Sequence, residues 1–377
     1  MPDLYDAVAY GMWAYSAAAF RAEKVVSTRA RLETGTLIAV THRKESDVPL
    51  ICPPLYRLGG MRTDRAARMH FAARDDMFLP GFFAGFPPGL SPLARRLLYR
   101  LSVARWLPVV QVHPIRSASV ARLGEVLAAR PDERLGELLT GEHKVLFQTR
   151  ARVCGLSEPV AAREALRGAY ADLLWRPVSP GKGVRPGLDG FWSARAAQAA
   201  RDFRALVDIV RRPATLVVFP EGRPSPDGEV GPVRPGIGAL LRRGRPHAVQ
   251  PVALAYDPLV RGRTKLVIAI PEPVESPQGK DAEAVLLTVL RRSLPLTAGQ
   301  FAAHRLLEGT EADPAALGRE LAAAVDAAQA EKRPIETSLL ARQTRRQRLA
   351  EALAIAPAKP EVLDFLAREY RTARQPV

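Results

Sequence analysis

The sequence of 377 residues is poor in cysteine and histidine, the side chains that most often build disulfide frameworks and zinc sites. It contains six histidines and two cysteines, Cys52 and Cys154. The two cysteines show no metal-ligand spacing and cannot form a disulfide framework, so we exclude small disulfide-stapled domains and expect no bound metal. Both cysteines are predicted to be core thiols, which fits a reducing, cytosolic environment.

Long apolar runs are also missing from the sequence. No uninterrupted apolar stretch reaches about 18 to 20 residues, the length that a membrane-spanning helix needs. The first residues do not place a basic segment ahead of an apolar run, as a signal peptide would. We therefore expect neither a spanning helix nor a signal peptide.

Acidic residues are outnumbered by basic ones, 39 against 55, which gives a formal net charge of +16. Such an excess attracts anionic phospholipid headgroups as readily as nucleic-acid phosphates, and each basic residue near a membrane contributes about 1 kcal/mol. The aromatic-basic motifs of the usual RNA-binding modules are missing, which counts against nucleic acid as the partner. The hydrophobic content of 47% excludes a disordered chain and is enough for a sizeable core.

The most informative segment is Leu216 to Leu241, where a short apolar strand runs into a Pro-Glu-Gly turn. Pro220 ends the strand because it lacks the N–H group and has a fixed φ angle. Gly222 lets the backbone approach a ligand closely. A Pro-Gly pair behind the turn is typical of a helix start, where free N–H groups can face an anion. Arg223 and Arg234 flank the same loop.

A second segment lies far upstream, where the apolar run Leu37 to Val40 is followed by His42 and Asp47. In a tight turn that enters a helix, the Asp47 carboxylate can fold back onto the imidazole of His42. It would then fix the tautomer and leave the other ring nitrogen free as a general base. Taken alone, a histidine and an aspartate at this spacing are more often exposed polar residues, so the pair needs a second motif beside it.

The order and spacing of the two segments resemble the PlsC-type glycerolipid acyltransferase family, whose members are 1-acylglycerol-3-phosphate acyltransferase-like. The resemblance covers about residues 1 to 116 and 213 to 275. A further likeness lies in the alanine-then-acidic stretch at Met69 to Pro80. The segments that resemble the four family blocks are Thr41 to Asp47, Val109 to Arg116, Phe219 to Ser225, and Val249 to Ala253.

The chain departs from the family pattern in three places. After Phe-Pro-Glu-Gly the family has Thr-Arg-Ser, whereas this chain has Arg223, Pro224 and Ser225, so the arginine comes one position early. In the second block only Arg116 carries over. The first block has a Glu-Ser pair at 45–46 where small or aromatic residues are common.

The resemblance implies a fold, an activity and its co-substrates. The expected fold is α/β, a mixed, largely parallel sheet flanked by helices, with a helical insertion and a helical C-terminal tail. Its site is expected at the carboxyl ends of the strands. The implied activity is O-acyl transfer from acyl-CoA or acyl-ACP to a hydroxyl of 1-acylglycerol 3-phosphate or glycerol 3-phosphate. No bound cofactor or metal is implied, and the acyl carrier is a co-substrate.

The resemblance also assigns roles to residues. His42 is expected to be the general base and Asp47 the residue that orients it. The residues expected to hold the acceptor are Arg116, Glu221, Gly222 and Arg223. For each a plainer interpretation stays open: a helix-capping histidine, a glutamate paired within a turn, and arginines that are ordinary solvated charges.

Three regions are expected along the chain. Residues 1–22 are predicted to form an N-terminal interfacial helix that carries Trp13 and Tyr15, and residues 23–275 an acyltransferase domain with a helical insertion at about 117–213. Residues 276–377 are predicted to form a C-terminal helical region. A second interfacial candidate is the apolar and basic stretch 82–101. Packing against the core is the alternative for both interfacial segments.

The expected partners are a lipid substrate, the acyl carrier and an anionic membrane surface, with the protein peripheral on the cytoplasmic side. Nucleic acid is not expected. Two alternatives stay open: an acyltransferase for another lysophospholipid or hydroxylated lipid, and a catalytically inactive basic protein that binds lipid or nucleic acid.

Overall fold

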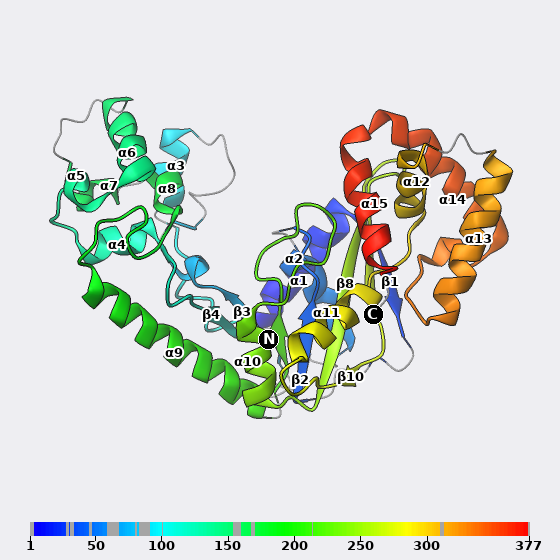
Figure 1. Cartoon of the computed structure of the whole chain (residues 1–377), viewed down its shortest axis with the longest axis horizontal. Helices are drawn as coiled ribbons and strands as arrows, with labels where there is room; N and C mark the ends of the chain where they lie inside the picture. The colour runs from blue at the N-terminus through cyan, green and yellow to red at the C-terminus, as the bar shows by residue number, and fades with distance from the viewer. Residues whose placement is uncertain are drawn as a thin grey trace. The chain divides into compact units, whose positions relative to one another are not determined.

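A computed structural model describes residues 4–27, 30, 34–44, 47–58, 68–79, 81–82, 91–99, 101–153, 160–166, 170–212, 214–309 and 313–375 (Figure 1). The chain divides into two compact units, and each is described by itself. Unit 1 comprises residues 1–71 and 207–377, and unit 2 comprises residues 72–206.

Unit 1 is built on a mixed, largely parallel β-sheet. Its strands are β1 (Arg21–Val26), β2 (Thr36–Val40), β7 (Leu216–Val218), β8 (Ala248–Asp257), β9 (Lys265–Ile270) and β10 (Val274–Glu275). The strand order is β1-β9-β8-β2-β7, and the first two residues of β3 (His70–Arg74) pair with β7. All these pairs are parallel except β8 with β9. The short β10 runs antiparallel to β8. The expected fold class is confirmed at this level.

The central strands are apolar because both faces of the sheet are covered. Every residue of β2, β7 and β9 is buried, as is typical of strands with helices on both sides. In the register, Ala39 of β2 lies opposite Val218 of β7 and Pro251 of β8. Since the three strands run parallel, the segments that follow β2 and β7 leave the sheet at the same edge. This edge brings together the two motifs that the sequence analysis selected.

Helices cover the sheet of unit 1 and continue beyond it. The helices nearest the sheet are α1 (Leu4–Ala19), α2 (Asp47–Leu58), α10 (Pro235–Gly244) and α11 (Ala282–Arg292) (Figure 1). The C-terminal helices are α12 (Ala298–Leu307), α13 (Pro314–Ala330), α14 (Arg342–Ile355) and α15 (Leu363–Thr372), with short 3₁₀ turns at 337–339, 356–358 and 360–362. α12 packs against α15 and α14, and these helices share one hydrophobic core with Leu259, just after β8.

Unit 2 is mainly helical. Its helices are the 3₁₀ turn η2 (Asp75–Phe78), α3 (Pro92–Tyr99), α4 (Leu123–Ala129), α5 (Leu135–Leu138), α6 (Gly141–Val153), α7 (Ala162–Ala165), α8 (Ala171–Leu174) and α9 (Asp189–Arg211) up to residue 206. Its strands are the end of β3, β4 (Val112–Ile115), and the antiparallel pair β5 (Ala121–Arg122) and β6 (Pro177–Val178). The core includes Phe147 stacked on Tyr170, with ring centroids 5.4 Å apart.

The compact units do not coincide with the predicted regions 1–22, 23–275 and 276–377. Unit 2 begins at Ala72 rather than near residue 117, and the C-terminal helices belong to unit 1. α1 packs against α2 within the same unit. Contacts between segments that are distant in the sequence decide where a unit ends. Hydrophobic periodicity along the chain does not reveal such contacts.

Several predictions from sequence can be compared with the described residues. Cys52 is buried in α2, and burial raises the pKa of its thiol to about 12, as for an unreactive core residue. Cys154, the Glu-Ser pair at 45–46, Pro80 and, within the stretch 82–101, residues 83–90 and 100 lie outside the described residues. Within the part that is described, no helix has both the length and the apolar character needed to cross a membrane.

Candidate active site

The site begins with Asp47, the first residue of α2. Its carboxylate is fully buried and faces four donors. Oδ2 lies 3.0 Å from Nδ1 of His42 and accepts the backbone N–H groups of Arg43 (2.5 Å) and Lys44 (2.9 Å). Oδ1 accepts the hydroxyl of Tyr256 at 2.6 Å. These hydrogen bonds replace the hydration that the carboxylate loses on burial. The contact that the five-residue spacing favours is therefore present.

His42 is held by the strand before it and by an aromatic neighbour. Thr41 continues the pairing of β2, because its N–H donates to the carbonyl of Val252 at 3.0 Å. The imidazole packs against the ring of Phe219, with centroids 4.5 Å apart. Because Nδ1 faces the Asp47 carboxylate, the neutral ring carries its proton there and has its lone pair on Nε2. The side chain is 9% exposed, so little of the ring meets solvent.

Glu221 joins the two motifs. Its Oε1 accepts the backbone N–H of His42 at 2.8 Å, and its Oε2 accepts that of Gly231 at 2.8 Å. The His42 carbonyl in turn accepts the N–H of Ser225 at 2.9 Å. Burial raises the pKa of Glu221, while the nearby guanidinium of Arg43 lowers it. The carboxylate therefore positions the histidine turn. Its expected role in holding the acceptor stays a prediction.

Arg43 connects the site to the C-terminal helices. Its Nε lies 3.1 Å from Oε1 of Glu369 in α15, and both side chains are fully buried. Its Nη1 donates to the carbonyl of Glu229 at 2.8 Å. Glu369 also accepts the side-chain amide of Gln300 in α12 at 2.8 Å. Burial raises the pKa of Glu369, and the charge of Arg43 acts against that shift. The C-terminal helices therefore help to hold the residue next to the candidate base.

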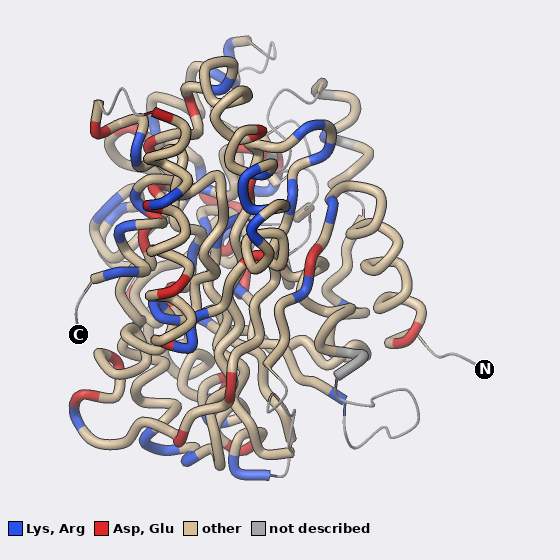
Figure 2. The backbone as a smooth tube through the Cα atoms, turned by 90° about the vertical axis from the view of Figure 1, so that its right-hand side faces the viewer, with Lys and Arg blue, Asp and Glu red and all other residues tan. Residues whose placement is uncertain are grey.

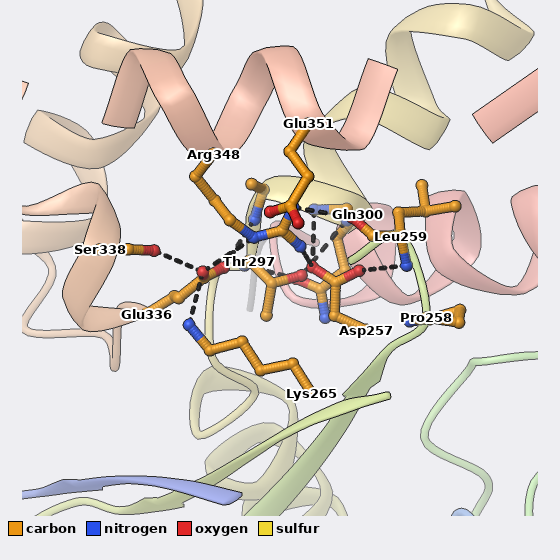
Figure 3. Close-up of polar contacts among 12 residues, drawn as sticks. Asp257, Pro258, Leu259, Lys265, Thr297, Gln300, Glu336, Ser338, Arg348 and Glu351 are labelled. Atoms are coloured by element: carbon orange, nitrogen blue, oxygen red, sulfur yellow. Dashed lines mark hydrogen bonds and ion pairs between the residues drawn. The ribbon is translucent and has the colours of Figure 1, made fainter. Parts of the chain in front are cut away.

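A second buried network ties the end of β8 to the same helices (Figure 3). Asp257, which follows Tyr256, accepts the N–H groups of Leu259 and Gly299, both at 2.9 Å, and pairs with Arg348 at 2.5 Å. Arg348 also lies 3.2 Å from Glu336. Burial raises the pKa of Asp257, and the charge of Arg348 opposes this rise. The network fixes the strand end that carries Tyr256.

In this network, the buried charge of Glu336 is balanced by nearby cations. Lys265 in β9 lies 2.7 Å from Glu336 and 2.6 Å from Glu23 in β1. Burial by itself raises the pKa of Glu336, but the charges of Arg348 and Lys265 outweigh it and lower the pKa overall. The two cations thus keep a buried carboxylate ionised between the sheet and α14.

The turn after Glu221 exposes Gly222 and Arg223 to solvent. Gly222 has φ of 70°, a conformation that favours glycine, and it is exposed. Arg223 is exposed, and no described side chain pairs with it. The Arg234 side chain lies across Gly222 and donates from Nε to the carbonyl of Glu221 at 3.0 Å. Two arginines thus flank the exposed glycine of the turn.

Arg116 belongs to unit 2, where two carboxylates already surround it. Its Nε lies 3.0 Å from Asp202 and its Nη1 lies 3.4 Å from Glu125. These ion pairs balance the guanidinium charge within that unit. Its expected role in holding the acceptor stays a prediction.

Four residues of the site were not selected from the sequence for the contacts they make: Arg43, Arg234, Tyr256 and Glu369. Tyr256 lies 209 residues from Asp47, and only the register of β8 beside β2 places its hydroxyl there. Arg234 was seen to flank the loop, but its contact with Glu221 depends on the fold of residues 222–234. Among the described residues, no cluster of three or more His, Cys, Asp or Glu side chains could hold a metal ion.

Comparisons with known proteins add little to this geometry. No protein-family model matches the chain, and no curated protein sequence matches it. Among solved structures, the chain is similar to the 1-acyl-sn-glycerophosphate (LPA) acyltransferase PlsC from Thermotoga maritima, with 13% identity and a TM-score of 0.38 over 77% of this chain and 79% of that chain. A similarity of this size establishes neither a shared fold nor a shared activity, so a functional conclusion has to rest on the residues of the chain itself.

Proposed function

We propose that the protein is an O-acyltransferase with a PlsC-type acyltransferase fold, which moves a fatty acyl group from a thioester carrier to a glycerolipid hydroxyl. The proposal rests on the hydrogen bonding of the His42 imidazole. Its Nδ1 is hydrogen-bonded to the buried carboxylate of Asp47, while its Nε2 has no partner among the described residues. This arrangement is what a general base needs, because the orienting carboxylate also stabilises the imidazolium that forms.

In the proposed reaction, His42 acts directly on the acceptor hydroxyl. Nε2 takes the hydroxyl proton as the oxygen attacks the thioester carbonyl carbon. The new C–O bond forms, the C–S bond breaks, and the sulfur leaves as a thiolate that takes the proton back from the imidazolium. The products are an ester and a free thiol, and His42 is neutral again. Asp47 stays ionised throughout and holds the ring.

The position of the site supports a substrate that approaches the strand edge. Because the segments after β2 and β7 leave the sheet at one edge, the base and the exposed turn at Gly222 lie at the carboxyl ends of parallel strands, where ligands of α/β sheets usually bind. Acceptors that suit the sequence resemblance are 1-acylglycerol 3-phosphate and glycerol 3-phosphate. Acyl-CoA or acyl-ACP would supply the acyl group.

We also propose that the protein works as a peripheral protein on the cytoplasmic side of an anionic membrane. α1 exposes the aromatic side chains Tyr10, Trp13 and Tyr15, each by about 45%, and such rings favour the membrane interface. The net charge of +16 adds attraction to anionic headgroups. Figure 2 shows basic and acidic residues interspersed along the backbone, so the basic residues are not gathered in one segment.

The proposal is tested by offering the purified protein a panel of lysolipids and acyl thioesters and identifying the products by mass spectrometry. We expect an acylated phospholipid product and release of free thiol. His42→Ala should lower kcat by roughly 10²- to 10⁴-fold, because general-base catalysis is lost. His247→Ala, which changes an exposed histidine before β8, is the matched control. Full activity of the His42 variant, or no product from any acceptor with the unaltered protein, would refute the proposal.

A further inference from the structure

Arg234 is held over the exposed turn by two contacts with Glu221 and Gly222. Its Nε donates to the Glu221 carbonyl at 3.0 Å. Its Cγ and Nε lie 3.2 and 3.3 Å from the position that a Cβ would occupy on Gly222, so the side chain runs directly over this glycine. The backbone N–H of Arg234 also donates to the carbonyl of Pro220 at 2.9 Å. Hydrogen bonds therefore hold Arg234 at its backbone N–H and at its side-chain Nε.

The charge of Arg234 is not balanced locally. Within the described ranges, no carboxylate forms an ion pair with it, and its two terminal nitrogens have no hydrogen-bond partner. The carboxylate of Glu221, the residue whose carbonyl accepts the Arg234 Nε, is already engaged by the N–H groups of His42 and Gly231. The backbone N–H of Arg223 is likewise without an acceptor in the described part of the chain. Arg234 thus has two free donors at a solvent-exposed turn, next to another free N–H group.

Arg234 and His42, the candidate base, both donate hydrogen bonds to Glu221. The side chain of Glu221 holds His42 at 2.8 Å, and its backbone carbonyl holds Arg234. In 1-acylglycerol 3-phosphate the reacting hydroxyl and the phosphate are carried by adjacent carbons. A cation that binds this phosphate must therefore lie close to the base, and Arg234 is linked to the backbone of His42 through the single residue Glu221.

We propose that Arg234 binds the phosphate of the acceptor and so selects phosphorylated glycerolipids; this inference rests on the proposed acyltransferase function. The free edge of the guanidinium offers two parallel N–H donors that match two phosphate oxygens. Since Nε is already anchored, little side-chain freedom remains to be lost when the phosphate binds. Arg223 carries the same charge on a side chain without such an anchor, and Arg116 is already paired with Asp202 and Glu125.

The test compares two acceptors that differ only in the phosphate: 1-acylglycerol 3-phosphate and 1-acylglycerol. Arg234→Ala should raise KM for the phosphorylated acceptor by roughly 10- to 100-fold, as expected for the loss of charge-assisted hydrogen bonds. Its KM for 1-acylglycerol should change far less than its KM for the phosphorylated acceptor. Arg234→Lys keeps the charge but loses the paired N–H donors of the guanidinium. Its KM for the phosphorylated acceptor should therefore lie between that of the unaltered protein and that of Arg234→Ala. Arg368→Ala changes an exposed arginine beside Asp227 of the same loop and is the matched control.

Direct binding separates this inference from the proposed reaction. Calorimetric titration with glycerol 3-phosphate should show binding to the unaltered protein and to the Arg368 variant, and about 10-fold or weaker binding to Arg234→Ala. Glycerol, which lacks the phosphate, should not distinguish the variants. The inference is overturned if Arg234→Ala binds glycerol 3-phosphate as the unaltered protein does, or if Arg223→Ala has the larger effect. A protein that binds glycerol 3-phosphate through Arg234 but acylates no acceptor would contradict the proposed function alone.

Discussion

The buried pair of Arg43 and Glu369 gives the sharpest prediction about stability. Glu369→Ala removes the carboxylate that lies 3.1 Å from the Arg43 guanidinium and also removes the acceptor of the Gln300 amide. Breaking a buried pair in this way destabilises a protein by roughly 3–5 kcal/mol, because the remaining charge is left without a partner. A whole domain is typically stable by about 5–15 kcal/mol. The variant should therefore lose a large part of the stability of unit 1.

The measurement is unfolding in urea, monitored by the hydrogen exchange of peptides from β2 and β8, because these peptides report on unit 1. At an m-value of about 2 kcal/mol per M, the midpoint should fall by roughly 2 M. The double variant Arg43→Met, Glu369→Leu should regain most of this loss, because replacing both charges by apolar groups removes the unpaired charge. Asp132→Ala, which breaks a pair whose side chains are 65% and 81% exposed, is the control and should change the midpoint little.

Two results would refute this reasoning about Arg43 and Glu369. The first is a Glu369→Ala variant that unfolds at the same urea concentration as the unaltered protein. The second is a double variant whose loss of stability equals the sum of the losses in Arg43→Met alone and Glu369→Leu alone. Such additivity would mean that the two side chains do not interact.

Three further predictions concern other parts of the site. Tyr256→Phe removes the hydroxyl that donates to Asp47 at 2.6 Å and should lower stability by roughly 1.5–3 kcal/mol, as read from urea midpoints; an unchanged midpoint would mean that solvent replaces the bond. Gly228→Ala should destabilise the loop, because its Cβ would lie 2.2 Å from the carbonyl oxygen of Phe365; increased protease cleavage of the loop tests this, and unchanged cleavage contradicts it. Burial raises the pKa of Glu221 above its ordinary value of 4.5, so the folded state keeps that proton to a higher pH than the unfolded state does. Its contribution to stability is therefore complete below pH 4.5 and is lost as the pH rises through the folded pKa. Glu221→Gln should gain stability relative to the unaltered protein across that window, and a pH-independent difference would argue against a raised pKa.

The sequence predicts the parts of the site that local signals encode. An apolar run followed by His42 and another followed by Glu221 indicate two strand ends, and parallel strands bring such ends to one edge. Tyr256 and Glu369 could not be found in this way, because their roles depend on contacts across long stretches of chain. The same limit applies to the regions: periodicity predicts helices after residue 277, but the burial of Glu369 against Arg43 makes them part of the unit that holds the site.

The contact between Arg43 and α15 has a consequence for how the protein is made. The ribosome produces Arg43 several hundred residues before Glu369, so a nascent chain holds this guanidinium without its partner for most of its synthesis. Until α15 has emerged and docked, the histidine turn lacks the contact between Arg43 and Glu369. A chain that stops before α15 should therefore carry both sequence motifs and still leave the buried guanidinium beside His42 without its carboxylate partner.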